Sequence, residues 1–346
     1  MVNEVSNIQY LRAIAVLMVV YVHSVEQFSW LDSYFFAAIG HSGVDLFFII
    51  SGFIMVYATN NKNINFMFFL YNRLVRIVPM YWFFTTIFLI ISAFMPSLVN
   101  NSNLDGWHVF SSYFFIPSYS PNYPENYWPL LIPGWTLNYE MVFYLLFSCS
   151  LMFVGVYRVV CLSFLMFFLF IFSSYFDSIE SLGFYANYII FEFLLGAFFG
   201  VFFVKYFSSC NSFFGFFICF IAVFLWFYLD GKSERFLHLG IPSFLFFIGF
   251  LYIDKRFVLG NKIMHLIGDS SYSIYLSHAF SLSFLKFVFV AFGYSYYTGD
   301  FLKGFIFVLL SVLFSAIVGV IVHRLLEKPV ALFLKGMYLK NQRGFL

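Results

Sequence analysis

Long apolar stretches separated by short polar connections dominate the chain. Apolar runs of about 17–25 residues are long enough to cross the hydrocarbon core of a membrane as helices. Such runs lie near residues 8–28, 43–59, 78–99, 137–156, 157–176, 184–206, 213–230, 236–253, 270–292 and 303–326. The pattern predicts an all-α fold, a polytopic membrane protein with about ten transmembrane helices around an internal polar cavity. No repeat or soluble module is visible, so we expect a single transmembrane domain over residues 1–346.

The composition excludes a water-soluble fold. Hydrophobic residues make up 62% of the 346 residues and charged residues 10%, against about 45–50% and 25% in an average soluble domain. The 57 phenylalanines suit lipid-facing positions that accept any large apolar side chain, so we infer no function from them. The four cysteines show no short paired spacing, and the sequence therefore indicates neither a metal site nor a redox pair.

The basic residues indicate how the chain crosses the membrane, because cytoplasmic loops and helix ends collect Lys and Arg. With the N-terminus inside, 14 of the 18 Lys and Arg fall on the cytoplasmic side. Lys232, Arg235 and Lys303 fall outside, and Lys286 lies within the ninth span. We therefore expect both termini in the cytoplasm, and segment 96–133, which has no Lys or Arg, outside.

Segment 96–133 is rich in Pro, Tyr and Trp, and its repeated Pro prevents a continuous helix between Pro117 and Pro129. The aromatic rings fit two interpretations: a platform for sugar rings, or an aromatic belt at the lipid–water interface. The sequence does not separate the two.

The first span carries ionisable groups that a membrane helix does not need. Arg12 and His23 are eleven positions apart, which places them within roughly 20° of one helix face and about 16 Å apart along its axis. A histidine at that depth can take up and return a proton near neutral pH, as a general base must. A packing role for His23 is the alternative. Glu26, one turn later, fits either a partner that orients the ring or a carboxylate at the outer interface.

Further polar groups lie at the ends of other spans. Asp45 is at a level comparable with His23, so a His–Asp couple is possible, and so is a helix cap. Arg73 and Arg76 share a helix face and suit bidentate contacts with phosphate, although isolated arginines there are more often positive-inside anchors. Glu140 is a third acid. His278 follows a run of hydroxyl residues in the ninth span, and these groups could line a wet cavity or join helices.

Taken together, these residues resemble the acyltransferase 3 family of bacterial integral membrane acyltransferases, in its branch of exopolysaccharide and O-antigen O-acetylases. The resemblance covers nearly the whole chain, and its strength is that six motifs occur in order. They are residues 7–15 (NIQYLRAIA) with His23; 43–53 (GVDLFFIISGF); Arg73 to Arg76 followed by Pro79; 134–137 (GWTL) with Glu140; 271–276 (SYSIYL) with His278; and 327–329 (EKP).

The resemblance implies that cytoplasmic acyl-coenzyme A donates an acyl group to a sugar hydroxyl on the outer side of the bacterial inner membrane. Arg12 and His23 match the family's arginine and essential histidine, and Arg73 and Arg76 match its paired arginines. We therefore expect the three arginines to bind the donor, with acetyl-CoA the expected one. No metal is implied.

We expect His23 to act as general base, with Asp45 or Glu140 orienting it or stabilising its charge. An acyl-histidine intermediate is the alternative route. Trp135, Tyr275 and His278 are the expected substrate-binding residues.

The expected acceptor is an O-antigen, capsule or exopolysaccharide, or its lipid-linked oligosaccharide precursor. Membrane lipid is the other expected partner, and no nucleic acid is expected. A transporter or flippase for the same precursors is the rival function. The absence of a two-fold internal repeat and the paired arginines speak against it. The sequence does not identify the sugar, the acyl length or the oligomeric state.

Overall fold

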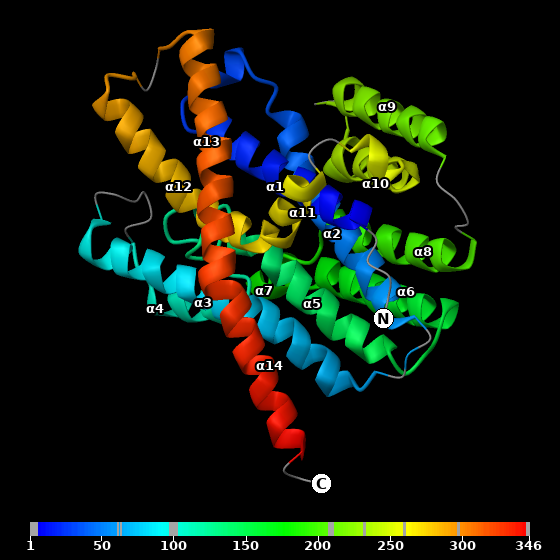
Figure 1. Ribbon diagram of the computed structural model, residues 1–346. Coiled ribbons are helices and arrows are strands. Elements are labelled where there is room, and N and C mark those ends of the chain that lie inside the picture. Colours follow the sequence, from blue (N-terminus) through cyan, green and yellow to red (C-terminus); the bar gives the residue numbers. More distant parts are fainter. Residues whose placement is uncertain are drawn as a thin grey trace. The chain divides into compact units, whose positions relative to one another are not determined.

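The computed structural model describes residues 6–60, 62, 64–96, 103–206, 211–230, 233–258, 261–295 and 298–343. Over these residues the chain is helical and contains no β-strand, as the hydrophobic pattern predicts (Figure 1). Cys210 and Lys232 lie outside the described residues. The chain forms two compact units, each built from two segments. Unit 1 comprises residues 1–58 and 191–323, and unit 2 comprises residues 59–190 and 324–346.

Unit 1 contains the N-terminal helices and most of the C-terminal half. Its elements are α1 (Ser6–Val25), η1 (Leu31–Ser33), α2 (Ala38–Thr59), α8 (Phe191–Tyr206), α9 (Ser212–Leu229), η5 (Phe236–Gly240), α10 (Ile241–Tyr252), η6 (Lys255–Phe257), α11 (Asn261–Asp269), α12 (Ser271–Ala291) and α13 (Phe301–Val322). Neighbouring pairs such as α9 with α10, and α12 with α13, lie side by side (Figure 1).

Unit 2 contains the middle of the chain and its C-terminal helix. Its elements are α3 (Phe66–Phe94), α4 (Gly106–Tyr113), η3 (Ile132–Gly134), α5 (Trp135–Ser150), α6 (Val156–Tyr175), α7 (Glu180–Gly183), η4 (Tyr188–Ile190) and α14 (Lys328–Arg343), which follows the π-helical turn η7 (His323–Glu327). Arg158 is buried within this unit and donates to Thr59 Oγ1 at 2.7 Å.

The predicted spans correspond to helices. Eight described helices are long and apolar enough to cross a membrane, and α5 and the shorter apolar stretch Phe236–Tyr252 account for the two remaining predicted spans. The largest boundary differences are at two places. The third span starts at Phe66 rather than near residue 78, because the Asn65 side chain caps the helix by accepting from Met67 N at 2.8 Å. The last one continues as a helical stretch over Phe301–Tyr338 instead of ending near residue 326.

Segment 96–133, predicted as a loop, includes the short helix α4. Asp105 starts this helix by accepting from His108 N at 2.8 Å. Between Pro117 and Pro129 the chain is not helical, as its prolines predict. The rings of Tyr119 and Tyr127 stack there with centroids 4.2 Å apart, and their hydroxyls are hydrogen-bonded at 2.8 Å. These rings contact one another, which fits both interpretations of the segment.

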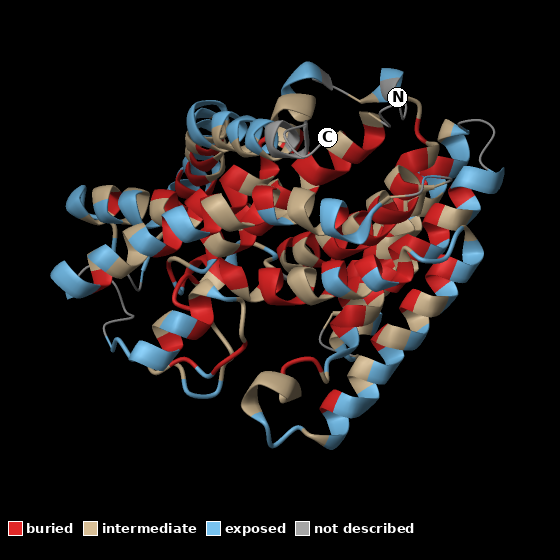
Figure 2. Ribbon diagram, turned by 90° about the horizontal axis from the view of Figure 1, so that it is seen from below, coloured by how far each residue is buried: buried red, intermediate tan, exposed pale blue. Residues whose placement is uncertain are grey.

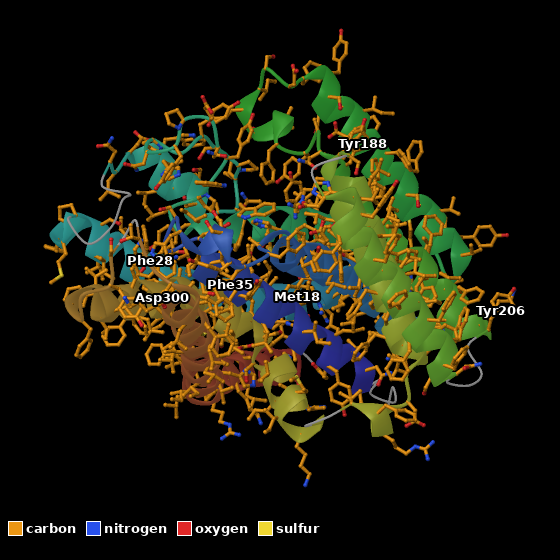
Figure 3. The ribbon with its side chains drawn as sticks, turned by 90° about the horizontal axis from the view of Figure 1, so that it is seen from above. Met18, Phe28, Phe35, Tyr188, Tyr206 and Asp300 are labelled. Carbon is orange, nitrogen blue, oxygen red and sulfur yellow. The ribbon has the colours of Figure 1, made fainter. Side chains whose placement is uncertain are left out.

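Two hydrophobic cores hold unit 1 together. The first is built around fully buried side chains such as Leu11, Ile49 and Phe247, with Met18 packed against it. The second surrounds Phe28, and Phe35 packs against it (Figure 3). Helices α1 and α2 are buried or half-buried throughout their described residues, whereas outer helices such as α6, α9 and α13 expose many apolar side chains. The exposed residues lie on the outside of the helices (Figure 2), where membrane helices meet lipid.

Helices α2 and α8 approach each other so closely that only glycine fits at two positions. A Cβ atom at Gly52 would lie 1.9 Å from the Phe193 carbonyl oxygen, and one at Gly196 would lie 1.9 Å from that of Ile49. Small residues allow this approach between membrane helices. The contact matters for the site because α2 carries Asp45 and α8 carries Glu192.

Candidate active site

His23 lies in the last turn of α1 with 39% of its side chain exposed. Its Nδ1 is 2.7 Å from Glu26 Oε2. Because a carboxylate only accepts hydrogen bonds, we assign the shared hydrogen to Nδ1, and in the neutral ring Nε2 then carries the lone pair. No hydrogen bond within the described part of the chain engages Nε2. In that neutral form, Nε2 can accept a hydrogen bond or a proton.

Glu26 connects His23 with a second histidine. His41, in the first turn of α2, places Nε2 3.7 Å from Glu26 Oε1. Burial acts to raise the pKa of the Glu26 carboxyl, but the hydrogen bond from His23 and the charges of His23 and His41 outweigh it, so the pKa lies below its ordinary value. Glu26 is thus a carboxylate at neutral pH, able to orient the His23 ring. This supports the first of the two interpretations of Glu26.

His278 and Tyr275, both expected to bind substrate, lie together on α12 beside His23. The His278 ring stacks on that of His23 with centroids 5.3 Å apart and an interplanar angle of 18°. Its Nδ1 is hydrogen-bonded to the Tyr275 carbonyl oxygen, and the Tyr275 ring packs against Phe47. Both side chains are almost fully buried. His278 therefore lies directly against His23, and Tyr275 lies on the adjacent turn against His278, with ring centroids 5.8 Å apart.

Asp45 does not form the expected couple with His23. Its carboxylate is fully buried and accepts from Arg235 Nη2 at 2.9 Å. The Glu192 carboxyl, also fully buried, interacts with both Asp45 and Arg235. Gly240 leaves room for it, since a Cβ there would lie 2.9 Å from Glu192 Oε1. Asp45 pairs with Arg235 and not with His23 because a buried carboxylate needs a cation beside it, and Arg235 supplies that charge.

Arg12 forms hydrogen bonds with other residues of unit 1. Its side chain is almost fully buried and donates from Nη1 to Gln9 Oε1 at 2.9 Å and from Nη2 to Ser271 Oγ at 2.8 Å. The bond to Ser271 joins α1 to the start of α12, the helix that carries His278, whereas the bond to Gln9 lies within α1. The structure thus gives Arg12 a joining role between two helices of the site, while donor binding by Arg12 stays a prediction.

Arg73 and Arg76 lie in unit 2 on α3. The Arg73 guanidinium lies over the rings of Phe69 and Tyr144, 5.5 and 5.9 Å from their centroids. Glu140, expected to act on His23, accepts a hydrogen bond from the Tyr144 hydroxyl and interacts with Arg73. Its partners in the structure are therefore residues of the predicted donor site.

Trp135, expected to contact substrate, also lies in unit 2. It is the first residue of α5, and its ring meets that of Tyr139 edge-on at 6.1 Å. Trp135 is partly exposed, whereas Tyr139 is buried. A role for Trp135 in substrate binding stays a prediction.

Two residues of the site were missed by the sequence interpretation. Glu192 is an acid inside a predicted span, and the rule that such groups mark functional sites would have identified it. Arg235 was interpreted as a loop cation, and its pairing with Asp45, 190 positions away, leaves no signal in local spacing.

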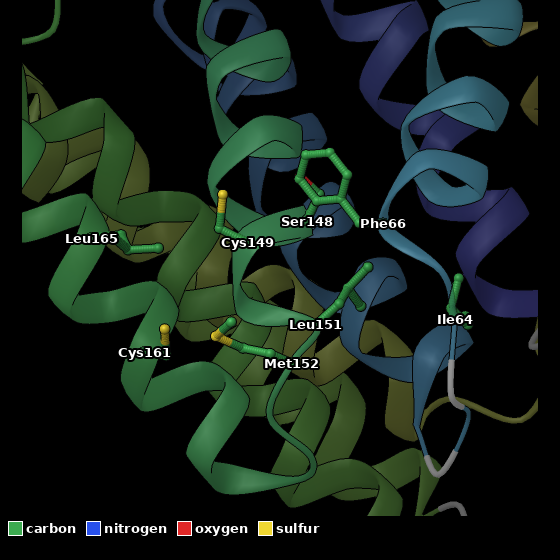
Figure 4. A pocket seen from close by; sticks show the side chains of 8 residues that line it. All are labelled: Ile64, Phe66, Ser148, Cys149, Leu151, Met152, Cys161 and Leu165. Carbon is green, nitrogen blue, oxygen red and sulfur yellow. The ribbon is translucent and has the colours of Figure 1, made fainter.

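A mainly apolar pocket of about 540 Å³ lies in unit 2 (Figure 4). None of the predicted site residues of that unit lines it. Ser148, Cys149 and Cys161 are its polar or polarisable lining groups, and the remaining side chains are hydrophobic. Such a lining offers no acid or base for chemistry at neutral pH.

Two comparisons with known proteins found a match. The profile of a family described as an acyltransferase domain matches residues 5–323. The chain is also 33% identical over 298 residues to the exopolysaccharide production protein ExoZ of Rhizobium meliloti (strain 1021), covering 84% of this chain and 90% of that protein. No solved structure matches.

Proposed function

The chain belongs to the acyltransferase 3 family, and on that premise we propose that it is an O-acyltransferase, specifically an O-acetyltransferase, that uses acyl-coenzyme A to modify a sugar hydroxyl of an envelope polysaccharide or its lipid-linked precursor. The observation that carries the proposal is His23, half exposed, with Nδ1 held by Glu26 and Nε2 left as a base. The relative named for exopolysaccharide production supports a polysaccharide acceptor. Membership of this family disfavours the transporter hypothesis.

In the proposed reaction, Nε2 of His23 takes the proton from the sugar hydroxyl as its oxygen attacks the thioester carbonyl carbon. The carbon–sulfur bond then breaks, and the leaving thiolate receives that proton from the imidazolium. Glu26 stabilises the imidazolium while it exists, because its carboxylate accepts from Nδ1 at 2.7 Å. No proton is gained or lost overall.

The function is tested on the polysaccharide itself. We expect NMR spectra of surface polysaccharide to lose O-acyl signals when the gene is deleted and to regain them when it is restored. Unchanged acylation in the deletion strain would contradict the proposal.

We propose that Arg73 and Arg76 bind phosphate groups of the donor. Arg73→Ala and Arg76→Ala should each raise the KM for acyl-CoA by about tenfold or more, because a charge-assisted hydrogen bond contributes roughly 1.5–3 kcal/mol. The KM for the acceptor should stay nearly constant. Arg324→Ala, which removes an exposed cation from η7, is the matched control. A change confined to the acceptor KM would show that these arginines do not bind the donor.

We also propose that both termini face the cytoplasm and that segment 96–133 faces outward in the bacterial inner membrane. In a variant without native cysteines, Glu125→Cys should react with an impermeant thiol reagent in intact spheroplasts, because Glu125 is exposed in that segment. Lys328→Cys should react only after permeabilisation. The reverse pattern would contradict this orientation.

A further inference from the structure

Helix α14 lies beyond the region matched by the family, which ends at residue 323. Within unit 2, α14 packs against α3. The Tyr71 hydroxyl donates to the Leu334 carbonyl oxygen at 2.7 Å, and the Tyr71 ring stacks on Tyr338 with centroids 4.3 Å apart. Phe68 also contacts the Tyr338 ring. The part of α14 around Leu334 is therefore held against the turn of α3 that precedes Arg73.

This contact places a third cation beside the two arginines. Lys335 follows Leu334 and interacts electrostatically with both Arg73 and Arg76. Within the described residues, neither Lys335 nor Arg76 forms an ion pair with a carboxylate. Glu140 interacts with Arg73. The three positive charges repel one another, and an anionic ligand that binds among them relieves this repulsion.

The ligand chemistry follows from the number and kind of cations. Two guanidinium groups suit bidentate phosphate contacts, and a lysine on a flexible stem adds a point charge for a further phosphate. Lys335 is exposed, so it is accessible to a ligand. Coenzyme A carries a diphosphate and a separate ribose phosphate, and therefore offers more phosphate groups than one guanidinium pair would bind.

We infer that Lys335, held in place by the stacking of Tyr338 on Tyr71, completes the phosphate-binding site of the acyl donor, so that α14 is part of the donor site. This inference rests on the proposed function.

The test is calorimetric titration of coenzyme A into the full-length protein in neutral detergent. Lys335→Ala should weaken binding by about tenfold, the usual loss for one charge-assisted phosphate contact, and should reduce the salt dependence of binding. Lys335→Arg keeps the charge and should bind within about twofold of wild type. Arg324→Ala removes an equal charge three helical turns away and should leave binding unchanged.

The outcomes separate this inference from the proposed function. If Lys335→Ala binds coenzyme A like wild type while Arg73→Ala does not, the inference is wrong and the proposed function stands. Equal weakening by Arg324→Ala would show a general field effect and would also overturn the inference. It is likewise overturned if Lys335→Ala changes binding only when phosphatidylglycerol is added, because the cluster would then bind a lipid headgroup. A wild-type protein that binds no coenzyme A would overturn the proposed function itself.

Discussion

His23→Ala should insert into the membrane and bind the donor normally, yet transfer acyl groups about 10²–10⁴-fold more slowly, which is the usual contribution of general acid–base catalysis. In the proposed reaction Nε2 takes the hydroxyl proton, and alanine offers no such base. The side chain is half exposed, with Glu26 as its hydrogen-bond partner, so its loss should cost little stability. Turnover per folded molecule, measured on purified protein, checks this.

His265→Ala is the matched control, because His265 is also a half-exposed histidine in unit 1 paired with a carboxylate, Asp269, at 3.1 Å. It should keep the wild-type rate. A purely packing role for His23 predicts the opposite pattern: lower detergent stability with near-normal activity per folded molecule. That pattern would contradict the catalytic assignment.

The pH profile gives a second readout. The wild-type rate should fall at acid pH, since a protonated imidazole can no longer accept the hydroxyl proton. Glu26 should not cause this fall, because its pKa is lowered in the folded protein. Its contact with His23 is present at neutral pH and is lost only as pH drops through that lowered value. Glu26→Gln should therefore slow the reaction without removing the acid limb.

Arg235→Ala should destabilise unit 1 strongly. Asp45 is fully buried and ion-paired to Arg235 at 2.9 Å, with the buried Glu192 carboxyl beside it. Removing the cation leaves a buried charge uncompensated, which typically costs about 3–5 kcal/mol. We expect a large fall in the thermal unfolding midpoint of the detergent-purified protein.

Asp45→Asn should be milder, because the Arg235 side chain is 35% exposed and water can solvate it. The double variant Asp45→Asn/Arg235→Ala should regain much of the stability lost in Arg235→Ala, since no charge is left at Asp45. If Arg235→Ala unfolds at the wild-type temperature, this ion pair does not stabilise the unit.

Hydrophobic runs predicted the helices well, because membrane depth and apolar length are directly related. They predicted helix ends poorly where a helix continues outside the hydrocarbon. The first turns of α3 carry Asn72, Arg73 and Arg76, and the last turns of α14 are polar. The apolar run of the sequence ends where the chain leaves the hydrocarbon of the membrane. The helix itself continues, because backbone hydrogen bonds and capping side chains do not depend on hydrophobicity.

The part of the site that lies within one stretch of helix was predictable from helix geometry. His23 and Glu26 are three positions apart, so their contact follows from helix geometry. The pairing of Asp45 with Arg235 and the stacking of His23 on His278 join residues far apart in the sequence. Only the packing of different helices determines such contacts, and a single sequence does not record it.

Acyl transfer from a thioester is measured most directly by the release of coenzyme A thiol by purified wild-type protein given acetyl-CoA with and without a polysaccharide acceptor. We expect acceptor-dependent thiol release matched by acetyl groups on the acceptor, and loss of both in His23→Ala. Protein that is folded and binds acceptor, yet releases no thiol and acylates nothing, would contradict the proposed function.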